Sequence, residues 1–200
     1  MKKLLVCTAM MLATMGAKAQ SAVGEFSIQP KVGMSIANLT DIDDSKSKIG
    51  FVAGAEVRYQ FHPVVAVEGG LLYSMQGAKI DATADPKFNL EYVNMPIMAS
   101  FQVYKGLYLR TGVQFGFLTK SEFEIEGSNA KFDGDIKDNT ESVDISIPFG
   151  ASYEYKGFVL DARYNLGLTK TFKSDIKYME DNLDSKNSVF NITLGYRFTI

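Results

Sequence analysis

Few residues of this 200-residue chain have types that support nucleophilic or acid–base catalysis. The sequence has one histidine, His62, and it directly precedes Pro63 in a segment that predicts a short turn. Activation of a serine or threonine hydroxyl usually needs a base held beside it. Because a histidine in a turn is more often a solvated residue than a base, we predict no catalytic residue and no enzyme activity.

Acidic residues in two polar segments offer oxygen atoms to a metal ion or a carboxylate pair to a protease. They are Asp41, Asp43 and Asp44 in one segment, and Asp133, Asp135, Asp138 and Asn139 in the other. The second group suits a hard cation, but its spacing does not match an EF-hand loop, which ends in a bidentate Glu. We therefore predict no metal site and no cofactor. A carboxylate-only protease stays open as an alternative, since nothing in the sequence sets the separation of these acids.

Most other charged residues lie in segments of strict alternation. In Gly50–Phe61, Phe51, Val57 and Tyr59 fall at one parity, and Glu56 and Arg58 fall at the other. Successive side chains of a β-strand point to opposite faces, so each such strand has one apolar and one polar face.

Eight segments of this kind follow one another along the chain. They are Phe26–Leu39, Ile49–Phe61, Val64–Gly77, Leu90–Tyr104, Leu107–Lys120, Val143–Tyr155, Phe158–Thr171 and Ser188–Phe198. Long polar loops (40–48, 78–89, 121–142 and 172–187) alternate with the short turns His62-Pro63, Lys105-Gly106 and Lys156-Gly157. This order predicts an all-β fold, an eight-stranded antiparallel up-and-down transmembrane β-barrel with its long loops at one end.

The polar parity carries both signs of charge in nearly equal number. Its charged members are Lys31, Glu56, Arg58, Glu68, Arg110, Asp144, Glu154, Asp161, Arg163 and Arg197, and the rest are mainly Gly, Ser, Ala, Asn and Gln. An eight-stranded barrel is only wide enough for side chains to fill it, so we predict a plugged lumen with a structural charge network. The apolar parity, free of charge in the strand middles, then faces lipid. A soluble lipocalin-like barrel with the apolar face inside is the alternative.

The N-terminal residues predict a targeting segment. Lys2 and Lys3 precede the apolar run Leu4–Met15, and Ala17-Lys18-Ala19 is a small-x-small cleavage site. We predict a signal peptide over 1–19 and one outer-membrane β-barrel domain over 20–200. The formal net charge of -2 loses three positive charges on cleavage, and an acidic chain argues against nucleic-acid binding.

Aromatic residues gather near the short turns and the C-terminus. They are Tyr59, Phe61, Phe101, Tyr153, Tyr155, Phe158, Tyr196 and Phe198. Such clustering is typical of the aromatic girdle that barrels place at a membrane interface.

Motifs throughout the chain resemble the bacterial outer-membrane β-barrel domain family whose members are often labelled PorT-like, and the architecture resembles small barrels of the OmpA/OmpX type. The motifs are Lys31-Val32-Gly33-Met34, Val67–Ser74, Tyr92–Pro96, Gly112–Gly116, Ile147–Gly150 and Leu194–Phe198. The last of these, with Gly195, Tyr196 and Phe198, also resembles the assembly signal of barrel proteins, although Thr199 and Ile200 follow the aromatic residue. These motifs specify a barrel and no ligand.

The expected location is the outer membrane of a Gram-negative cell, with both termini in the periplasm. We expect outer-membrane lipid, lipopolysaccharide, the barrel-assembly machinery and an unidentified extracellular or envelope protein as partners. The favoured function is a non-enzymatic barrel whose extracellular loops interact with partners, because function is usually carried on loops over a rigid scaffold. The apolar residues of these loops could bind a partner or, alternatively, extend the strands above the membrane as a protruding sheet edge; they are Phe123, Ile125, Phe132, Ile136, Tyr178 and Met179. The alternatives are a small-solute porin and an accessory protein in secretion across the outer membrane.

Overall fold

The computed structural model describes residues 22–40, 45–80, 87–127, 130–137, 140–172 and 185–200. The predicted signal peptide and its cleavage site lie outside these ranges. So do Asp41, Asp43, Asp44, Asp138 and Asn139, which the sequence offered as metal or protease carboxylates. Within the described ranges, no helix is long and apolar enough to cross a membrane.

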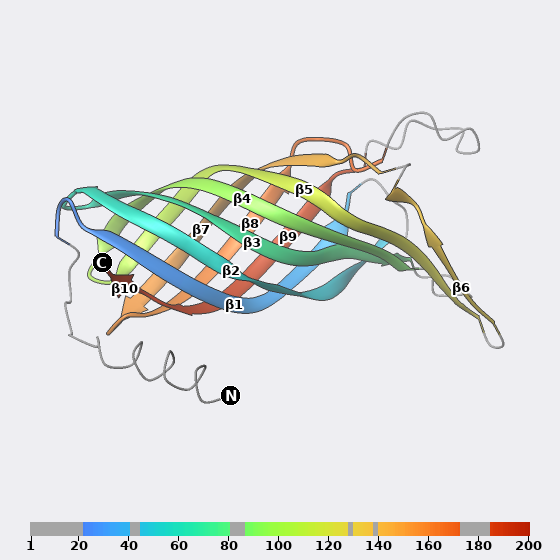
Figure 1. Cartoon of the computed structure of the whole chain (residues 1–200), viewed down its shortest axis with the longest axis horizontal. Helices are drawn as coiled ribbons and strands as arrows, with labels where there is room; N and C mark the ends of the chain where they lie inside the picture. The colour runs from blue at the N-terminus through green and yellow to red at the C-terminus, as the bar shows by residue number, and fades with distance from the viewer. Residues whose placement is uncertain (1–21, 41–44, 81–86, 128–129, 138–139, 173–184) are drawn as a thin grey trace.

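The described strands form one closed antiparallel sheet (Figure 1). They are β1 (Phe26–Leu39), β2 (Ser45–His62), β3 (Val65–Ile80), β4 (Lys87–Tyr104), β5 (Leu107–Gly127), β6 (Ala130–Asp135), β7 (Val143–Tyr155), β8 (Phe158–Gly167), β9 (Asn187–Tyr196) and β10 (Phe198–Thr199). Each barrel strand pairs with the next, and β1 pairs with β9 to close the barrel, for example at Met34 and Ile192. The predicted eight-stranded up-and-down barrel is confirmed, because β10 continues β9 and β6 pairs only with β5.

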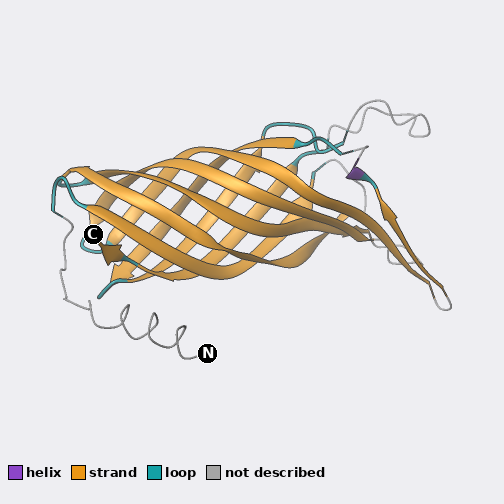
Figure 2. Ribbon diagram, in the orientation of Figure 1, coloured by secondary structure: helices purple, strands orange, loops and turns teal. Residues whose placement is uncertain are grey.

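The predicted strand limits are correct for β1 and β7 and too short at one end of the barrel. Four strands run further into the expected loops: β2 begins at Ser45, β3 ends at Ile80, β4 begins at Lys87 and β5 ends at Gly127. The predicted loop 121–142 is wrong over most of its length, because β5 and β6 form a hairpin there (Figure 2). In contrast, β8 ends at Gly167, before the predicted Thr171.

Three two-residue turns mark one end of the barrel, called the turn end here; the opposite end is the loop end. The turns at Lys105-Gly106 and Lys156-Gly157 are as predicted, with φ of 50° at Lys156 and 84° at Gly157. Positive φ at both central residues suits the right-handed twist of a hairpin. The first turn lies at Pro63-Val64, one residue later than predicted, because His62 still belongs to β2.

The two faces of the sheet have opposite character. Outward side chains are exposed and apolar, as at Leu160 (53% exposed) and Leu71 (60%). Inward charged side chains are buried, as at Arg110 (3%) and Arg163 (2%). This arrangement excludes the lipocalin-like alternative, in which the apolar face would fill the interior.

Candidate functional site

The centre of the lumen is occupied by Arg110 of β5 and three acidic side chains. The Nη2 atom of Arg110 lies 2.6 Å from Glu56 Oε2 on β2 and also donates to Glu68 of β3. Its Nη1 donates to Asp161 of β8. One guanidinium thus connects strands on different sides of the barrel through charge-assisted hydrogen bonds.

Glu56 is the acidic counterpart of Arg110, because it contacts three cations. Besides Arg110, Glu56 accepts from Arg163 Nη2 at 2.6 Å and from Lys31 Nζ at 2.8 Å. All these side chains are almost completely buried. Removing a charge from water costs several kcal/mol, and only close opposite charges and hydrogen bonds offset that cost.

A second group of charges lies nearer the turn end. Arg58 Nη1 is 3.4 Å from Glu68 Oε1, and Arg197 donates to Glu154 and to Gln29 Oε1. The Arg58 guanidinium also lies 4.3 Å from the centre of the Tyr108 ring, an attractive cation–π geometry. Glu68 links this group to the centre, because it contacts Arg110 as well.

Asp144, which the sequence placed with these charges, lies apart from them toward the loop end. Its Oδ1 accepts from Asn187 Nδ2 at 3.1 Å and from Thr169 Oγ1 at 3.5 Å. Asn187 Nδ2 also lies 3.3 Å from Tyr92 Oη. The structure therefore divides the ten predicted charged residues into a connected network and one carboxyl held by neutral donors.

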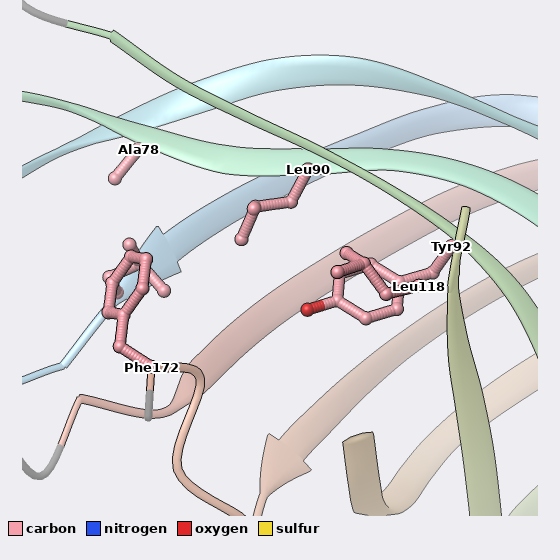
Figure 3. Packing of buried hydrophobic residues seen from close by; sticks show 6 residues of the cluster. Ala78, Leu90, Tyr92, Leu118 and Phe172 are labelled. Carbon is pink, nitrogen blue, oxygen red and sulfur yellow. The ribbon is translucent and has the colours of Figure 1, made fainter. Parts of the chain in front are cut away.

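The loop end of the lumen holds an apolar cluster beside Asp144 and Asn187, which the sequence did not predict. Inward residues Leu39, Leu90, Tyr92 and Leu118 pack together there with Ala78, and Phe172 covers them (Figure 3). Phe88 and Ile136 pack against this cluster from the rim. The sequence did contain a sign of this cluster. Leu90 and Tyr92 have the same parity as Asn94, which was assigned to the polar, inward face, so they also face inward.

Two kinds of side chain fill the lumen, paired charges and packed apolar groups. An ionic layer occupies its middle and turn end, and the apolar cluster lies at its loop end beside buried polar side chains such as Thr140 and Asn187. A passing solute would have to separate matched charges and then a packed apolar cluster.

Beyond the loop end, the sheet continues outward as an extension made by β2, β3, β4, β5 and β6. Phe88 of β4 pairs with Phe123 of β5, and their ring centres are 5.0 Å apart. Phe88 also contacts Phe172, at 5.5 Å between ring centres, so the extension is anchored to the apolar cluster. The β5–β6 hairpin projects furthest from the barrel (Figure 1). The side chains of Asp133 and Asp135 are not among those described.

The turn end carries aromatic side chains on its outer face. About half of each side chain is exposed: 49% for Tyr153, 60% for Tyr155 and 50% for Phe158. Tyr196 lies between Phe158 and Phe198, with ring centres 5.1 Å and 4.7 Å away. His62 lies at the same end, exposed, and its Nδ1 is 3.4 Å from the Val64 amide nitrogen.

Solved structures with the same fold are known outer-membrane proteins. The attachment invasion locus protein Ail of Yersinia pestis matches with 20% identity and a TM-score of 0.50, over 88% of this chain and 100% of Ail. Ail in complex with the heparin analogue sucrose octasulfate matches with 19% identity, the same TM-score and the same coverage. Neisserial surface protein A matches with 14% identity and a TM-score of 0.50, over 88% of this chain and 97% of that protein. No curated protein sequence matches the chain.

A family model named "Outer membrane protein beta-barrel domain" matches residues 18–173. The match covers more than half of the chain and includes β1 through β8. It agrees with the exposed apolar face and the buried charges, and it places the protein in the outer membrane. The chain belongs to the outer membrane protein β-barrel domain family.

Proposed function

We propose that this protein is a non-enzymatic, non-conducting barrel that presents its loop-end extension at the cell surface for interaction with other envelope or extracellular components. The observation that carries this proposal is the contrast between a filled lumen and an extended sheet. Arg110 and Glu56 fill the lumen with matched charges, while β5 and β6 continue well beyond it. The fold analogy with Ail, a protein named for attachment and invasion, supports a surface role.

The porin alternative is less well supported by the geometry. A conducting barrel needs an open polar path, whereas paired charges such as Arg110 and Glu56 occupy the middle of the lumen and Leu90, Leu118 and Phe172 pack together at the loop end. No contact of the described residues favours the secretion alternative over the surface role.

Two measurements test the proposal together. Purified protein in planar bilayers should give no steady ion-conducting openings, and regular openings would reverse the preference toward a porin. In intact cells, a cysteine introduced by Glu124→Cys in the extension should react with a membrane-impermeant maleimide. The matched control Lys156→Cys, at a turn, should react only after the cells are opened. The reverse labelling pattern would overturn the proposed orientation.

A separate experiment tests whether the loop-end extension binds a partner. A photo-crosslinking residue at position 124 should form an adduct with a partner in living cells, and shortening of the hairpin between Glu122 and Asp135 should remove it. Barrel formation, measured by heat-modifiable gel mobility, should stay unchanged in the shortened protein. Absence of any adduct together with unchanged surface behaviour of the shortened protein would contradict a loop-mediated role.

A further inference from the structure

One buried carboxyl of the lumen has no cation beside it among the described residues. Asp144 of β7 is 7% exposed, and the hydrogen bonds that it accepts come from uncharged groups, Asn187 Nδ2 and Thr169 Oγ1. An ionised carboxylate taken out of water needs a partner of opposite charge, or it takes up a proton. The buried cations of the described chain pair with other acids; these pairs are Lys31–Glu56, Arg58–Glu68, Arg110–Glu56, Arg163–Glu56 and Arg197–Glu154.

A buried amide oxygen lies next to this carboxyl without a donor of its own. Asn187, which is 3% exposed, donates its Nδ2 to Asp144 Oδ1 at 3.1 Å. Its Oδ1 has no hydrogen-bond partner among the described residues. Because Oδ1 and Nδ2 share one carbon atom, this oxygen is also close to the Asp144 carboxyl. Asn187 Nδ2 lies 3.3 Å from Tyr92 Oη, which brings a further buried oxygen to the same place.

A glycine leaves room beside these oxygen atoms. The strand register places Asn94 of β4, Gly116 of β5 and Asp144 in one row across three neighbouring strands. A Cβ atom on Gly116 would lie 2.8 Å from Asn94 Oδ1, 3.4 Å from Asp144 Cβ and 3.4 Å from Tyr92 Cδ1. These side chains therefore surround the place that a side chain of Gly116 would occupy. The name glycine cradle is used for this place and its walls, Tyr92, Asn94, Asp144 and Asn187.

The polar atoms that converge on the glycine cradle are oxygens. One carboxylate with amide and phenol oxygens suits a hard cation rather than a soft metal. A single carboxylate balances a single positive charge, so a monovalent ion leaves no excess charge in the barrel interior, whereas a divalent ion does. Oxygen ligands approach calcium, a hard cation of similar size to sodium, to about 2.3–2.6 Å. An ion of that size fits where a methyl group would be crowded.

We propose that the glycine cradle binds one alkali-metal cation, sodium or potassium, between the Asp144 carboxylate, Asn94 Oδ1 and Asn187 Oδ1. These ligands come from β7, β4 and β9, so the ion holds three strands together at the loop end, beside the apolar cluster that Phe172 covers. The sequence did not predict this site, because only the strand register brings these residues together. The site is independent of the orientation of the barrel and of any partner at the extension.

The test uses the mature chain folded in phosphatidylcholine vesicles and unfolded by urea, with heat-modifiable gel mobility as the readout. Sodium chloride and potassium chloride are each compared with choline chloride at equal ionic strength, since choline is too large for the cradle. The ratio of folded to unfolded protein should rise about 10-fold at an alkali-ion concentration ten times the dissociation constant. Equal ratios in all three salts would overturn the proposal and assign the neutralisation of Asp144 to a proton. Stabilisation by calcium chloride alone would contradict a monovalent site.

The variant Asp144→Asn keeps the shape of the side chain and removes its charge. It should give the same folded-to-unfolded ratio in sodium, potassium and choline chloride. The matched control is Glu122→Gln, which removes a partly exposed carboxylate of the extension and should keep the response of the parent to alkali ions. Equal responses of Asp144→Asn and the parent would show that the ions act elsewhere, and the proposal would be wrong.

A second variant tests the site if Asp144→Asn does not fold. Gly116→Ala keeps every proposed ligand and places a methyl group in the cradle, so most of the response to alkali ions should be lost. Gly69→Ala is its control, because the nearest atom to the new Cβ lies at 3.7 Å and the site is untouched. A full response in Gly116→Ala would contradict binding in the cradle.

The position of the ion can be determined directly with thallium(I), a potassium mimic that scatters X-rays anomalously. Crystals of the mature protein soaked in a thallium(I) salt should show an anomalous peak beside Asp144 and Asn187. Crystals of Asp144→Asn, or of Gly116→Ala, should show no peak there. Peaks at other positions only, or none in the parent, would overturn the proposal.

Discussion

Arg110 Nη2 lies 2.6 Å from Glu56 Oε2, and this contact joins β5 to β2 across the lumen although β3 and β4 separate the two strands in the sheet. Glu56 also contacts Lys31 of β1 and Arg163 of β8. One carboxylate therefore connects four strands around the barrel. The contact holds opposite walls at a fixed separation, which backbone pairing between neighbours cannot do.

Replacement Glu56→Gln should strongly destabilise the barrel. The substitution removes the anion that three buried cations share. Removing one partner of a buried ion pair leaves the other charge uncompensated and costs about 3–5 kcal/mol. The free energy of unfolding, measured by urea titration in vesicles with gel mobility as the readout, should fall by about that amount.

The control for this prediction is Glu122→Gln, which removes an ion pair between partly exposed residues, Glu122 and Lys120. Exposed pairs are screened by water and contribute little to stability, so the loss should be small. Comparable small losses in both variants would show that the lumen network does not stabilise the fold.

Two adjacent glycines on β3 should respond in opposite ways to alanine. A Cβ at inward Gly70 would lie 2.4 Å from the Ala55 carbonyl oxygen and 2.8 Å from Glu56 Cα, so the backbone of β2 would have to move. At Gly69, the nearest atom would be the Pro96 carbonyl oxygen at 3.7 Å, an ordinary contact. We expect Gly70→Ala to lower the free energy of unfolding by about 1–3 kcal/mol, by overpacking.

Gly69→Ala, measured in the same titration, should leave stability unchanged or raise it slightly, because alanine loses less conformational freedom on folding than glycine. A larger loss at Gly69 than at Gly70 would contradict the assignment of faces in this part of β3.

Sequence reasoning recovered the barrel because the period-two pattern is local. Phe51, Glu56 and Arg58 can be assigned to faces without knowing any other strand. It ended the β5 strand at Lys120 and kept a strand extension beyond it only as an alternative, since the polar residues there resemble a loop until β6 is seen to pair with them. The specific ion pairs were also beyond reach, because shear and register decide which inward charges share a level.

The apolar cluster at the loop end shows a different limit. Leu90 and Leu118 have inward parity, but the polar composition of most inward positions masked them. Phe172 belongs to no barrel strand, and its isolated bridge to Thr140 depends on tertiary structure alone. No periodicity assigns such a residue to the interior.

Phe172→Ala should destabilise the packing at the loop end and leave the ion pairs in the middle of the lumen intact. Phe172 is 7% exposed, contacts Phe88 and covers the apolar cluster, and truncation of a buried Phe costs about 3–5 kcal/mol. Hydrogen exchange should accelerate at the Glu141 and Thr171 amides, which bond to the neighbouring segments at 2.9 Å and 2.7 Å. Phe190→Ala, on the outer face of β9, is the control and should leave these amides unchanged. Unaltered exchange in Phe172→Ala would show that Phe172 does not hold the loop end.

The C-terminal residues close the barrel, and the sequence predicts that they also form an assembly signal; an experiment can separate these two roles. Phe198 and Thr199 pair with Ile28 and Ser27 to complete closure at the turn end, and Ile200 N donates to Phe26 O at 2.9 Å. Deletion of Tyr196–Ile200 should therefore abolish heat-modifiable barrel in cells. The double variant Y196A/F198A keeps the backbone pairs but removes the aromatic groups that resemble an assembly signal. It should refold in detergent like the parent and assemble poorly in cells, because recognition fails while closure remains possible. Normal amounts of barrel from the deletion would contradict both roles, and failure of the double variant to refold in detergent would assign the aromatic groups to stability.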